Sequence, residues 1–271
     1  MPDIELVPEE ATIKRIIQDS EEVKTFVLEK DSKEKMEAEL GQIVEISLQG
    51  YDEAPFAISR LFEDEKGFAV SVKRMGHLTK MLHRCSEGDK VGVRGPYGNS
   101  FPLNEWEGKD IYVMGGGIGM APLRPIIDYV LENRDQYGSL KIIFGARSPG
   151  LFLYKEDIEE WKKDEEIELH MTIDQPADGW DGNVGFVPDL VDELKIEREN
   201  TIGVICGPPV MINLTTQTLE ELGWKESDIY TTLERKMQCG IGKCGRCNIK
   251  EKMVCKDGPV FRIDQIPETA L

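Results

Sequence analysis

Residues 111–123 read IYVMGGGIGMAPL, in which an apolar run leads directly into a glycine-rich turn and then into a stretch with helical character. Glycines at the end of a strand let the backbone approach a pyrophosphate closely, and the N-terminus of the next helix offers unpaired N–H groups. The stretch therefore indicates a strand–turn–helix unit that binds a nucleotide, with Gly116, Gly117, Ile118 and Gly119 as candidate contacts. A purely structural turn is the alternative, because the spacing differs from G-x-G-x-x-G.

The residues after this turn alternate between apolar runs, which predict strands, and longer segments, which predict helices. The expected strands are Ile111–Met114, Leu140–Phe144, Ile167–Thr172 and Ile202–Cys206, and the expected helices are Ala121–Glu132, Lys155–Lys162, Val187–Leu194 and Pro209–Leu222. This alternation indicates a parallel sheet covered by helices on both faces, as in a Rossmann-like domain.

Two more strands of this sheet end in residues that suit a nucleotide. One ends in Cys206, Gly207 and Pro208, and another is followed by Arg147 and Ser148. Ligands of open α/β sheets bind at the carboxyl ends of the strands, so we expect these residues beside the glycine-rich turn. Arg147 and Ser148 could hold a 2′-phosphate, which would favour NADP, and an Arg exposed at a strand end is an equally good interpretation.

The first hundred residues predict β structure. Short segments rich in Val, Ile, Phe and Thr are separated by Gly, Asp and Glu clusters, at the spacing of a small antiparallel barrel. The expected strands are Ala11–Ile17, Val23–Lys30, Gln42–Leu48, Pro55–Leu61, Phe68–Lys73 and Lys90–Arg94. We also expect a short helix over Thr79–Cys85, a barrel-closing turn at Gly95–Phe101, and a solvated acidic loop around Asp31–Glu39.

Within this barrel, Pro55–Ser59 and Gly76–Thr79 are candidate binding segments. The second is similar to a phosphate-binding helix start, because Gly76 permits close approach and Thr79 offers a hydroxyl at the cap. Taken singly, each segment is also compatible with an ordinary strand or an ordinary helix start.

Four of the six cysteines lie within 17 residues near the C-terminus: Cys239, Cys244, Cys247 and Cys255. The Cys-x4-Cys-x2-Cys…Cys arrangement is the plant-type [2Fe–2S] spacing, and glycines between the cysteines suit a loop that wraps a cluster. Structural zinc sites use two Cys-x2-Cys pairs more often, and this segment contains only one. The spacing therefore favours a [2Fe–2S] cluster over zinc, and disulfides least.

Composition and charge exclude several classes of function. The chain has 271 residues, Lys+Arg 33 against Asp+Glu 51, and a formal net charge of −18, which disfavours nucleic acid and anionic membrane surfaces as partners. Residues 235–271 contain eight Lys/Arg and four Asp/Glu, so this basic tail indicates a separate lobe. The acidic N-terminus is unlike a signal peptide, and we expect a cytoplasmic protein whose thiols stay reduced.

The order of these motifs resembles the ferredoxin–NADP reductase superfamily, whose members join an FAD-binding barrel to a nucleotide-binding α/β domain. The resemblance implies FAD contacts at Pro55, Phe56, Ala57, Ile58, Ser59, Lys73, Gly76, Leu78 and Thr79, and a nicotinamide contact at Cys206. The sequence departs from the superfamily at Ala54–Ala57, where the usual Arg-x-Tyr-Ser signature is absent. A small buried apolar residue is the alternative role for Cys206.

With the cysteine segment, the chain is similar to the FAD- and [2Fe–2S]-containing electron-transfer subunits of multisubunit enzymes. Among them are the gamma subunits of sulfhydrogenases and the corresponding subunits of anaerobic sulfite reductase and dihydroorotate dehydrogenase. The short Cys247–Cys255 interval and Gly258–Phe261 favour the first two groups. The resemblance implies an α+β multidomain chain with a barrel at 1–105, a nucleotide domain at 106–232 and a cluster lobe at 233–271.

The resemblance also implies a function. The expected role is to carry electrons between NAD(P)H, FAD and a [2Fe–2S] cluster, to or from a partner redox subunit of the hydrogenase, sulfite reductase or heterodisulfide reductase type. A dihydroorotate dehydrogenase electron-transfer subunit is an alternative, and a zinc-stabilised module that senses nucleotide without chemistry is a weaker one.

Overall fold

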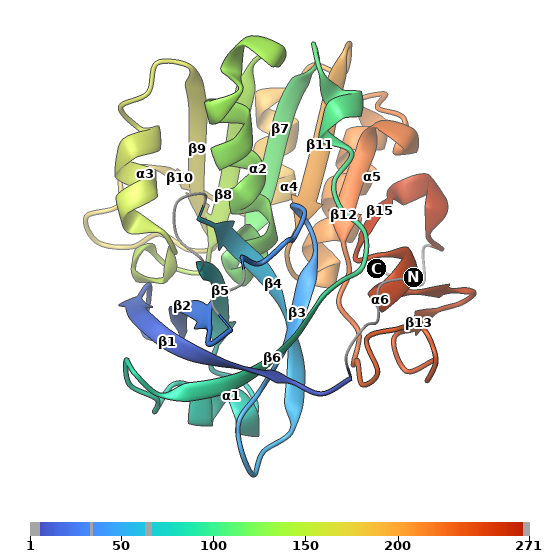
Figure 1. Ribbon diagram of the computed structural model, residues 1–271. Coiled ribbons are helices and arrows are strands. Elements are labelled where there is room, and N and C mark those ends of the chain that lie inside the picture. Colours follow the sequence, from blue (N-terminus) through green and yellow to red (C-terminus); the bar gives the residue numbers. More distant parts are fainter. Residues whose placement is uncertain (1–5, 33–34, 63–66, 268–271) are drawn as a thin grey trace. The chain divides into compact units, whose positions relative to one another are not determined.

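The computed structural model describes residues 6–32, 35–62 and 67–267, which form two compact units (Figure 1). The first unit contains residues up to 18, residues 22–101 and residues 233–260. The second contains residues 19–21, residues 102–232 and the residues from 261 onward. Among the described residues, no helix is long and apolar enough to cross a membrane.

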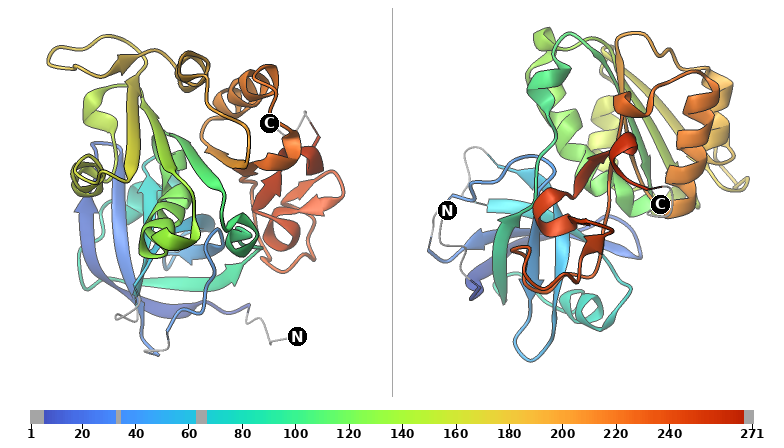
Figure 2. Two further views of the ribbon diagram at one scale, coloured as in Figure 1. Left: turned by 90° about the horizontal axis from the view of Figure 1, so that it is seen from above. Right: turned by 90° about the vertical axis from the view of Figure 1, so that its right-hand side faces the viewer.

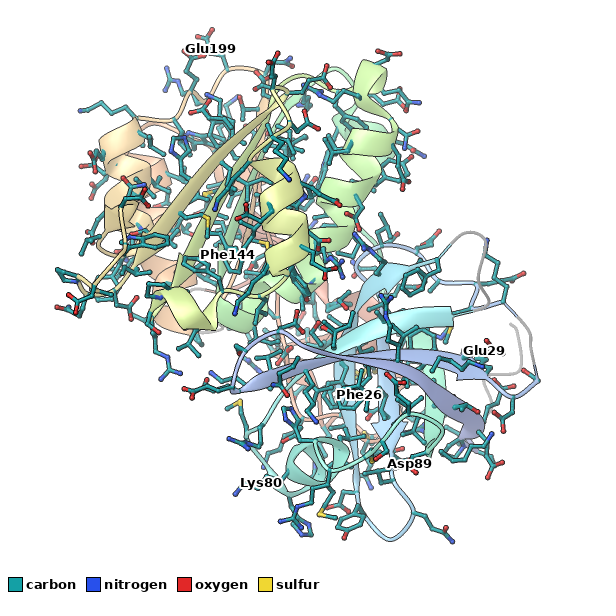
Figure 3. All side chains as sticks on the ribbon, turned by 90° about the vertical axis from the view of Figure 1, so that its left-hand side faces the viewer. Phe26, Glu29, Lys80, Asp89, Phe144 and Glu199 are labelled. Atoms are coloured by element: carbon teal, nitrogen blue, oxygen red, sulfur yellow. The ribbon has the colours of Figure 1, made fainter. Side chains whose placement is uncertain are left out.

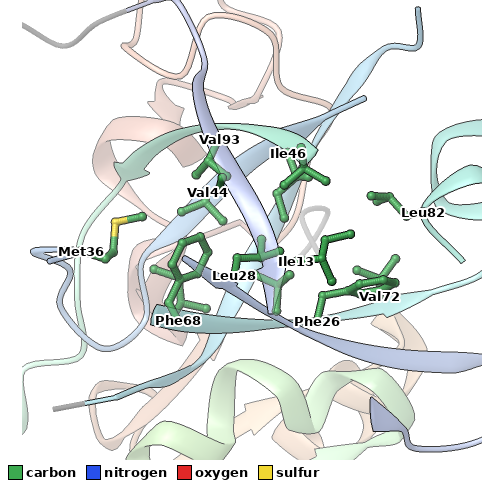
Figure 4. Packing of buried hydrophobic residues seen from close by; sticks show 14 of the residues in the cluster. Ile13, Phe26, Leu28, Met36, Val44, Ile46, Phe68, Val72, Leu82 and Val93 are labelled. Atoms are coloured by element: carbon green, nitrogen blue, oxygen red, sulfur yellow. The ribbon is translucent and has the colours of Figure 1, made fainter. Parts of the chain in front are cut away.

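A closed antiparallel barrel forms the larger part of the first unit, in the strand order β1-β2-β5-β4-β3-β6. Its strands are β1 (Glu9–Gln18), β2 (Val23–Lys30), β3 (Ile43–Ser47), β4 (Glu53–Leu61), β5 (Gly67–Lys73) and β6 (Lys90–Tyr97). Alternate side chains of these strands point inward, as the period of two requires, and fill the barrel with apolar groups such as Phe26, Val44 and Phe68 (Figure 4). The predicted barrel is confirmed.

Two sequence-based expectations for the barrel need correction. Met36 lies in the stretch expected to be a solvated loop, yet it is buried in the barrel core, because an apolar side chain within an acidic segment still gains from burial. The short helix α1 (His77–Leu82) begins and ends earlier than expected. It begins after Gly76 because the Thr79 hydroxyl accepts hydrogen bonds from the backbone N–H groups of Met75 and Gly76 at 2.9 Å.

Residues 233–260 pack with the barrel in the same compact unit (Figure 2, right). They contain β13 (Asn248–Ile249), β14 (Lys252–Met253) and α6 (Val254–Asp257). The Asn99 side chain pairs with the backbone of Val260 in the same way as the backbone of a neighbouring strand. Its amide group donates to the Val260 carbonyl at 2.8 Å and accepts from the Val260 N–H at 3.0 Å. A Cβ at Gly98 would lie 2.3 Å from the carbonyl oxygen of Gly258, so this approach requires glycine.

The second unit is built on a seven-stranded sheet in the order β10-β9-β8-β7-β11-β12-β15. The strands are β7 (Asp110–Gly116), β8 (Leu140–Ala146), β9 (Ile167–Ile173), β10 (Asn183–Val184), β11 (Thr201–Cys206), β12 (Ile229–Thr232) and β15 (Val260–Arg262). The ladders that join β10 through β12 are parallel, so the predicted parallel sheet is confirmed.

Helices cover both faces of this sheet. They are α2 (Met120–Glu132), α3 (Lys155–Trp161), α4 (Val187–Leu194) and α5 (Pro209–Glu221), and α2 lies on the face opposite α4 and α5 (Figures 1 and 2). Figure 3 shows Phe144 within this unit and Glu199 at its surface. Single 3-10 turns connect the elements of the chain at Leu103–Trp106, Gly117–Gly119, Arg134–Gln136, Pro149–Leu151, Glu226–Asp228 and Ile263–Gln265.

Candidate functional site

The glycine-rich turn and the Cys206 motif lie side by side at the carboxyl edge of the sheet. In the β7–β11 ladder, Cys206 is paired with Gly115. A Cβ added at Gly119 would lie 2.3 Å from the carbonyl oxygen of Cys206, and one at Gly116 would lie 3.3 Å from the Pro208 ring. The glycine-rich turn therefore needs glycine at both positions to pack this closely against the Cys206–Pro208 turn, at the start of α2 where a pyrophosphate is expected.

The third predicted nucleotide segment joins the same edge. Gly145 pairs with Gly116 in the β7–β8 ladder, and Arg147 and Ser148 follow directly after β8. The Arg147 side chain is exposed and Ser148 is half-buried. The sheet thus brings all three predicted segments to adjacent strand ends, which is the arrangement that a dinucleotide needs.

Cys206 has a partner that the sequence did not reveal. Its sulfur accepts a hydrogen bond from the hydroxyl of Thr232 at 2.9 Å, and both residues are buried. Thr232 ends β12, which runs parallel to β11, so the two side chains stand at the same level of neighbouring strands. Pairing of β11 with β12 creates this contact, and no local motif around Thr232 predicts it.

The predicted flavin strand β4 lines a pocket in the first unit. The pocket is bounded on one side by Ile43 and Pro55–Ala57, and on the other by Leu233–Arg235, Met237 and Val254. Its walls are largely apolar, as the edge of an aromatic ring system requires. Met237 and Val254 lie two residues and one residue from Cys239 and Cys255, respectively, so the pocket adjoins the cysteine segment.

Some predicted flavin contacts have no accessible side chain. Ile58 and Leu78 are buried in the barrel core, and Ser59 is fully buried at a bulge where its hydroxyl accepts from Ser71 at 3.3 Å. Only the backbone of these residues remains for a ligand. Lys73 is half-buried and pairs with Glu22 at 3.2 Å.

Gly76 and Thr79 stand at the start of α1. Gly76 is exposed, with open space where a Cβ would be, so the backbone there is accessible. The Thr79 hydroxyl already accepts from two N–H groups and donates to the Gly76 carbonyl at 3.2 Å. Its predicted contact with FAD stays a prediction.

The four clustered cysteines form two sulfur pairs. The Cys247 thiol contacts the Cys255 sulfur at 3.3 Å, and Cys244 interacts with Cys239 through both its backbone and its thiol. Among the described residues, no three His, Cys, Asp or Glu side chains are grouped around a single metal position. Two pairs of thiols supply the four sulfur ligands that the two irons of a [2Fe–2S] cluster require.

The backbone around these cysteines directs N–H groups at the sulfurs. Gly242 donates to Cys255 at 3.2 Å, and Lys243 and Cys244 donate to Cys239 at 3.3 and 3.4 Å. Gly240, Gly242 and Gly245 adopt φ values of 73°, 71° and 69°, which let the loop turn inward. N–H donors to sulfur are the contacts that stabilise an anionic iron–sulfur centre, so the segment fits that group.

The same contacts give the thiols of Cys239 and Cys255 different pKa values. Burial opposes ionisation of Cys239, but N–H groups of Ile241, Cys244 and Lys243 outweigh it and lower the pKa of this thiol to about 7. Burial and the hydrogen bond from Cys247 raise the pKa of Cys255 to about 12. The first and last thiols of the motif therefore differ in acidity.

A buried charge cluster lies where the barrel meets the cysteine segment, and no sequence pattern indicated it. Arg94 of β6 forms an ion pair with Glu53, and its side chain is 3% exposed. Glu45 lies opposite Arg94 in the β3–β6 ladder and is 1% exposed. Burial, together with the charge of Glu53, raises the pKa of Glu45 to about 7. Charged residues in strands usually indicate a solvent-facing position, which is why this cluster was missed.

Two protein families match parts of the chain. Residues 113–217 match the oxidoreductase NAD-binding domain, and residues 234–267 match the iron–sulfur cluster binding domain of dihydroorotate dehydrogenase B. The first match covers the sheet edge described above, and the second covers all four clustered cysteines.

Known relatives match most of the chain. The chain is 36% identical to sulfhydrogenase 1 subunit gamma of Pyrococcus furiosus, over 87% of this chain and 83% of the relative. It is also 36% identical to a probable dihydroorotate dehydrogenase B (NAD(+)) electron transfer subunit of Methanocaldococcus jannaschii, over 94% and 89% of the two chains.

Solved structures share the fold over most of the chain. An NADH-dependent reduced ferredoxin–NADP oxidoreductase, studied for flavin-based electron bifurcation, has a TM-score of 0.80 at 28% identity, with 99% of this chain and 92% of that chain covered. A ferredoxin NADP+ reductase from Neisseria gonorrhoeae, solved with FAD and NADP, has a TM-score of 0.69 at 18% identity, over 82% and 96% of the two chains, and shares the fold alone.

Proposed function

This chain belongs to the family of ferredoxin reductase-like electron-transfer subunits, which includes sulfhydrogenase gamma subunits and the electron-transfer subunits of dihydroorotate dehydrogenase B. On this basis we propose that the chain carries electrons between NAD(P)H, bound FAD and a [2Fe–2S] cluster, to or from a partner redox subunit. The partner belongs to the hydrogenase, sulfite reductase or heterodisulfide reductase type. The proposal includes a cytoplasmic location, where cluster thiols stay reduced.

One observation supports this proposal most strongly. The pocket along Pro55–Ala57 has its opposite wall in the segment that carries the four cysteines. A flavin bound there and a cluster held by Cys239, Cys244, Cys247 and Cys255 would lie within one compact unit. Nicotinamide delivers two electrons as hydride and a cluster accepts one, so a flavin between them supplies the necessary change from two electrons to one.

The residues of this chain bind and orient these groups. We assign the NAD(P)H pyrophosphate to Gly116–Gly119, the nicotinamide to the neighbourhood of Cys206–Pro208 and the ribose end to Arg147 and Ser148. Pro55–Ala57 would lie along the flavin ring, with Ile58 and Ser59 contributing backbone only. Lys73 and Gly76–Thr79 would face the FAD phosphates.

Anaerobic purification followed by metal and cofactor analysis tests the proposal. We expect about two iron and two sulfide per chain, one FAD, and visible absorption that bleaches on addition of NADH or NADPH, with a rhombic EPR signal from the reduced cluster. A colourless protein with one zinc per chain would instead support the nucleotide-sensing module.

The subunit role needs a separate experiment. Untagged protein isolated from its native source should co-elute with a second redox protein. A monomer with full reductase activity on a soluble carrier would overturn the subunit role while leaving the cofactors intact.

A dihydroorotate dehydrogenase electron-transfer subunit is the second candidate, favoured by the match of residues 234–267 and by the Methanocaldococcus jannaschii relative. Activity of the isolated complex decides between the two. Reduction of NAD+ by dihydroorotate would support this second candidate, whereas reduction by hydrogen would support a hydrogenase partner.

A further inference from the structure

Arg94 connects the barrel to the first cysteine of the cluster segment. Its guanidinium donates hydrogen bonds to the backbone carbonyls of Gln238 at 2.9 Å and Cys239 at 3.2 Å. It also donates to the hydroxyl of Tyr97 at 3.2 Å, and through Nε to Glu53 at 3.0 Å. Every one of these contacts lies within the first compact unit.

The hydrogen bonds from Arg94 to the two carbonyls are related to the course of the loop around the cysteine sulfurs. The backbone N–H groups of residues 242–244 point at Cys239 and Cys255, so carbonyls at the start of the segment turn the other way, toward the barrel. Backbone carbonyls need donors, and Arg94 supplies one each to the carbonyls of Gln238 and Cys239. Gly240 rests directly on the barrel as well, because a Cβ there would lie 2.6 Å from the Tyr97 ring.

Two carboxylates, those of Glu53 and Glu45, lie beside Arg94. Glu53 is its ion-pair partner and is 27% exposed, whereas the Arg94 side chain is 3% exposed. Neither carboxylate oxygen of the buried Glu45, opposite Arg94 in the ladder, has a hydrogen-bond partner among the described residues. A guanidinium keeps its proton in such surroundings, so Arg94 places a permanent positive charge against the backbone of Cys239.

We propose that Arg94 is a positioning residue that fixes Cys239 from the barrel side, and that its charge raises the reduction potential of the cluster while the Glu53 carboxylate lowers it. This inference depends on the proposed cluster. Reduction adds one negative charge to the cluster, so a nearby positive charge favours the reduced form and a nearby negative charge opposes it.

Two neutral variants separate an electrostatic role from a structural one. In Arg94→Gln the positive charge is lost, so the reduction potential should fall. In Glu53→Gln the negative charge is lost and Arg94 is left without its counter-ion, so the potential should rise. A charge within about 10 Å at an effective dielectric constant of about 20 changes an equilibrium roughly tenfold. A tenfold change corresponds to about 59 mV for one electron, and EPR-monitored redox titration of the purified holoprotein measures it.

Arg94→Lys provides the rescue. It keeps the charge but cannot reproduce the planar fork of bonds to Glu53 and the two carbonyls. We therefore expect a potential close to that of the unmodified protein, together with faster loss of iron on storage or with a chelator.

Arg124→Gln is the matched control. Arg124 also forms a buried ion pair, with Asp157 at 2.6 Å, and its side chain is 8% exposed, but it lies on α2 in the second unit. Its loss should lower stability as Arg94→Gln does and leave the cluster potential unchanged.

The outcomes distinguish this inference from the proposed function. If the unmodified protein holds no [2Fe–2S] cluster, the proposed function fails first. If it holds one and both Arg94→Gln and Glu53→Gln leave the potential unchanged, or move it in the same direction, the assignment to Arg94 is overturned. If either variant loses its cluster, the reduction potential of Arg94→Lys is compared with that of the unmodified protein. Arg94→Lys keeps the positive charge, so a fall in its potential as large as the fall expected for loss of that charge would contradict an electrostatic role.

Discussion

The hydroxyl of Thr232 donates a hydrogen bond to the sulfur of Cys206 across 2.9 Å, between the ends of two neighbouring parallel strands. The bond holds the thiol at the sheet edge where the nicotinamide is proposed to bind. Because a threonine hydroxyl can be replaced by a methyl group of similar size, this contact can be removed with little change of shape.

We predict that Thr232→Val lowers kcat/KM for NAD(P)H about fivefold, since the loss of one buried hydrogen bond costs about 1 kcal/mol. Steady-state reduction of an artificial acceptor measures this effect. Thr231→Val is the control, because the buried Thr231 hydroxyl has no hydrogen-bond partner among the described residues and its removal should be neutral or stabilising. Equal losses in both variants would contradict a role for the Thr232 bond.

The close contact between Gly119 and Cys206 gives a second prediction. In Gly119→Ala the new methyl group would lie 2.3 Å from a backbone carbonyl oxygen, so the turn must shift, at a cost of about 1–3 kcal/mol. Affinity for NAD(P)H, measured by calorimetry, should fall at least tenfold. Gly150→Ala has open space around its Cβ and should bind normally. Unchanged affinity in Gly119→Ala would show that the turn does not cradle the nucleotide.

Removal of single thiols tests the cluster assignment. Cys247→Ser and Cys255→Ser each break the sulfur pair at 3.3 Å, and we expect both variants to lose most of their iron and sulfide. Cys85→Ser is the matched control, because Cys85 packs against the barrel core and its thiol donates to the Met81 carbonyl. Full iron content in either cluster variant, by elemental analysis, would refute the assignment.

Glu45 predicts a dependence of stability on pH. Burial and the charge of Glu53 raise its pKa from 4.5 in the unfolded chain to about 7 in the folded protein, so the folded state prefers the protonated acid. The resulting destabilisation is absent below about pH 4.5, grows as the pH rises to 7, and then stays constant at about 3 kcal/mol.

Glu45→Gln removes this destabilisation. We expect the variant to be more stable than the unmodified protein at pH 8 and close to it at pH 5, as measured by denaturant-induced unfolding at both values. An equal difference at the two pH values would mean that Glu45 is not the titrating group.

Local sequence patterns predicted much of the architecture. Strand β2 and helix α4 have the expected bounds, and the strands around the glycine-rich turn differ by only a few residues, because apolar periodicity and turn residues are local signals. The cysteine spacing was equally informative, since the loop geometry of a cluster is set within 17 residues.

Other features depend on contacts between distant residues and could not be predicted. Strand β15 has three residues and no periodicity, and it exists only because β12 offers an edge. Arg94 was part of an expected strand, but its burial depends on a segment more than 140 residues away. The Thr232–Cys206 bond likewise joins two residues that lie 26 positions apart, at the ends of β11 and β12.

The chain enters the first unit at residue 233 and returns to the second at residue 261, where β15 completes the sheet beside β12. The cysteine segment is therefore an insertion, held at both ends, and not a detachable tail. A ribosome that stops at residue 232 would release a protein whose sheet ends in an uncovered edge at β12, a surface prone to aggregation. In such a chain, the loss of the cysteine segment and the exposure of this sheet edge would therefore occur together.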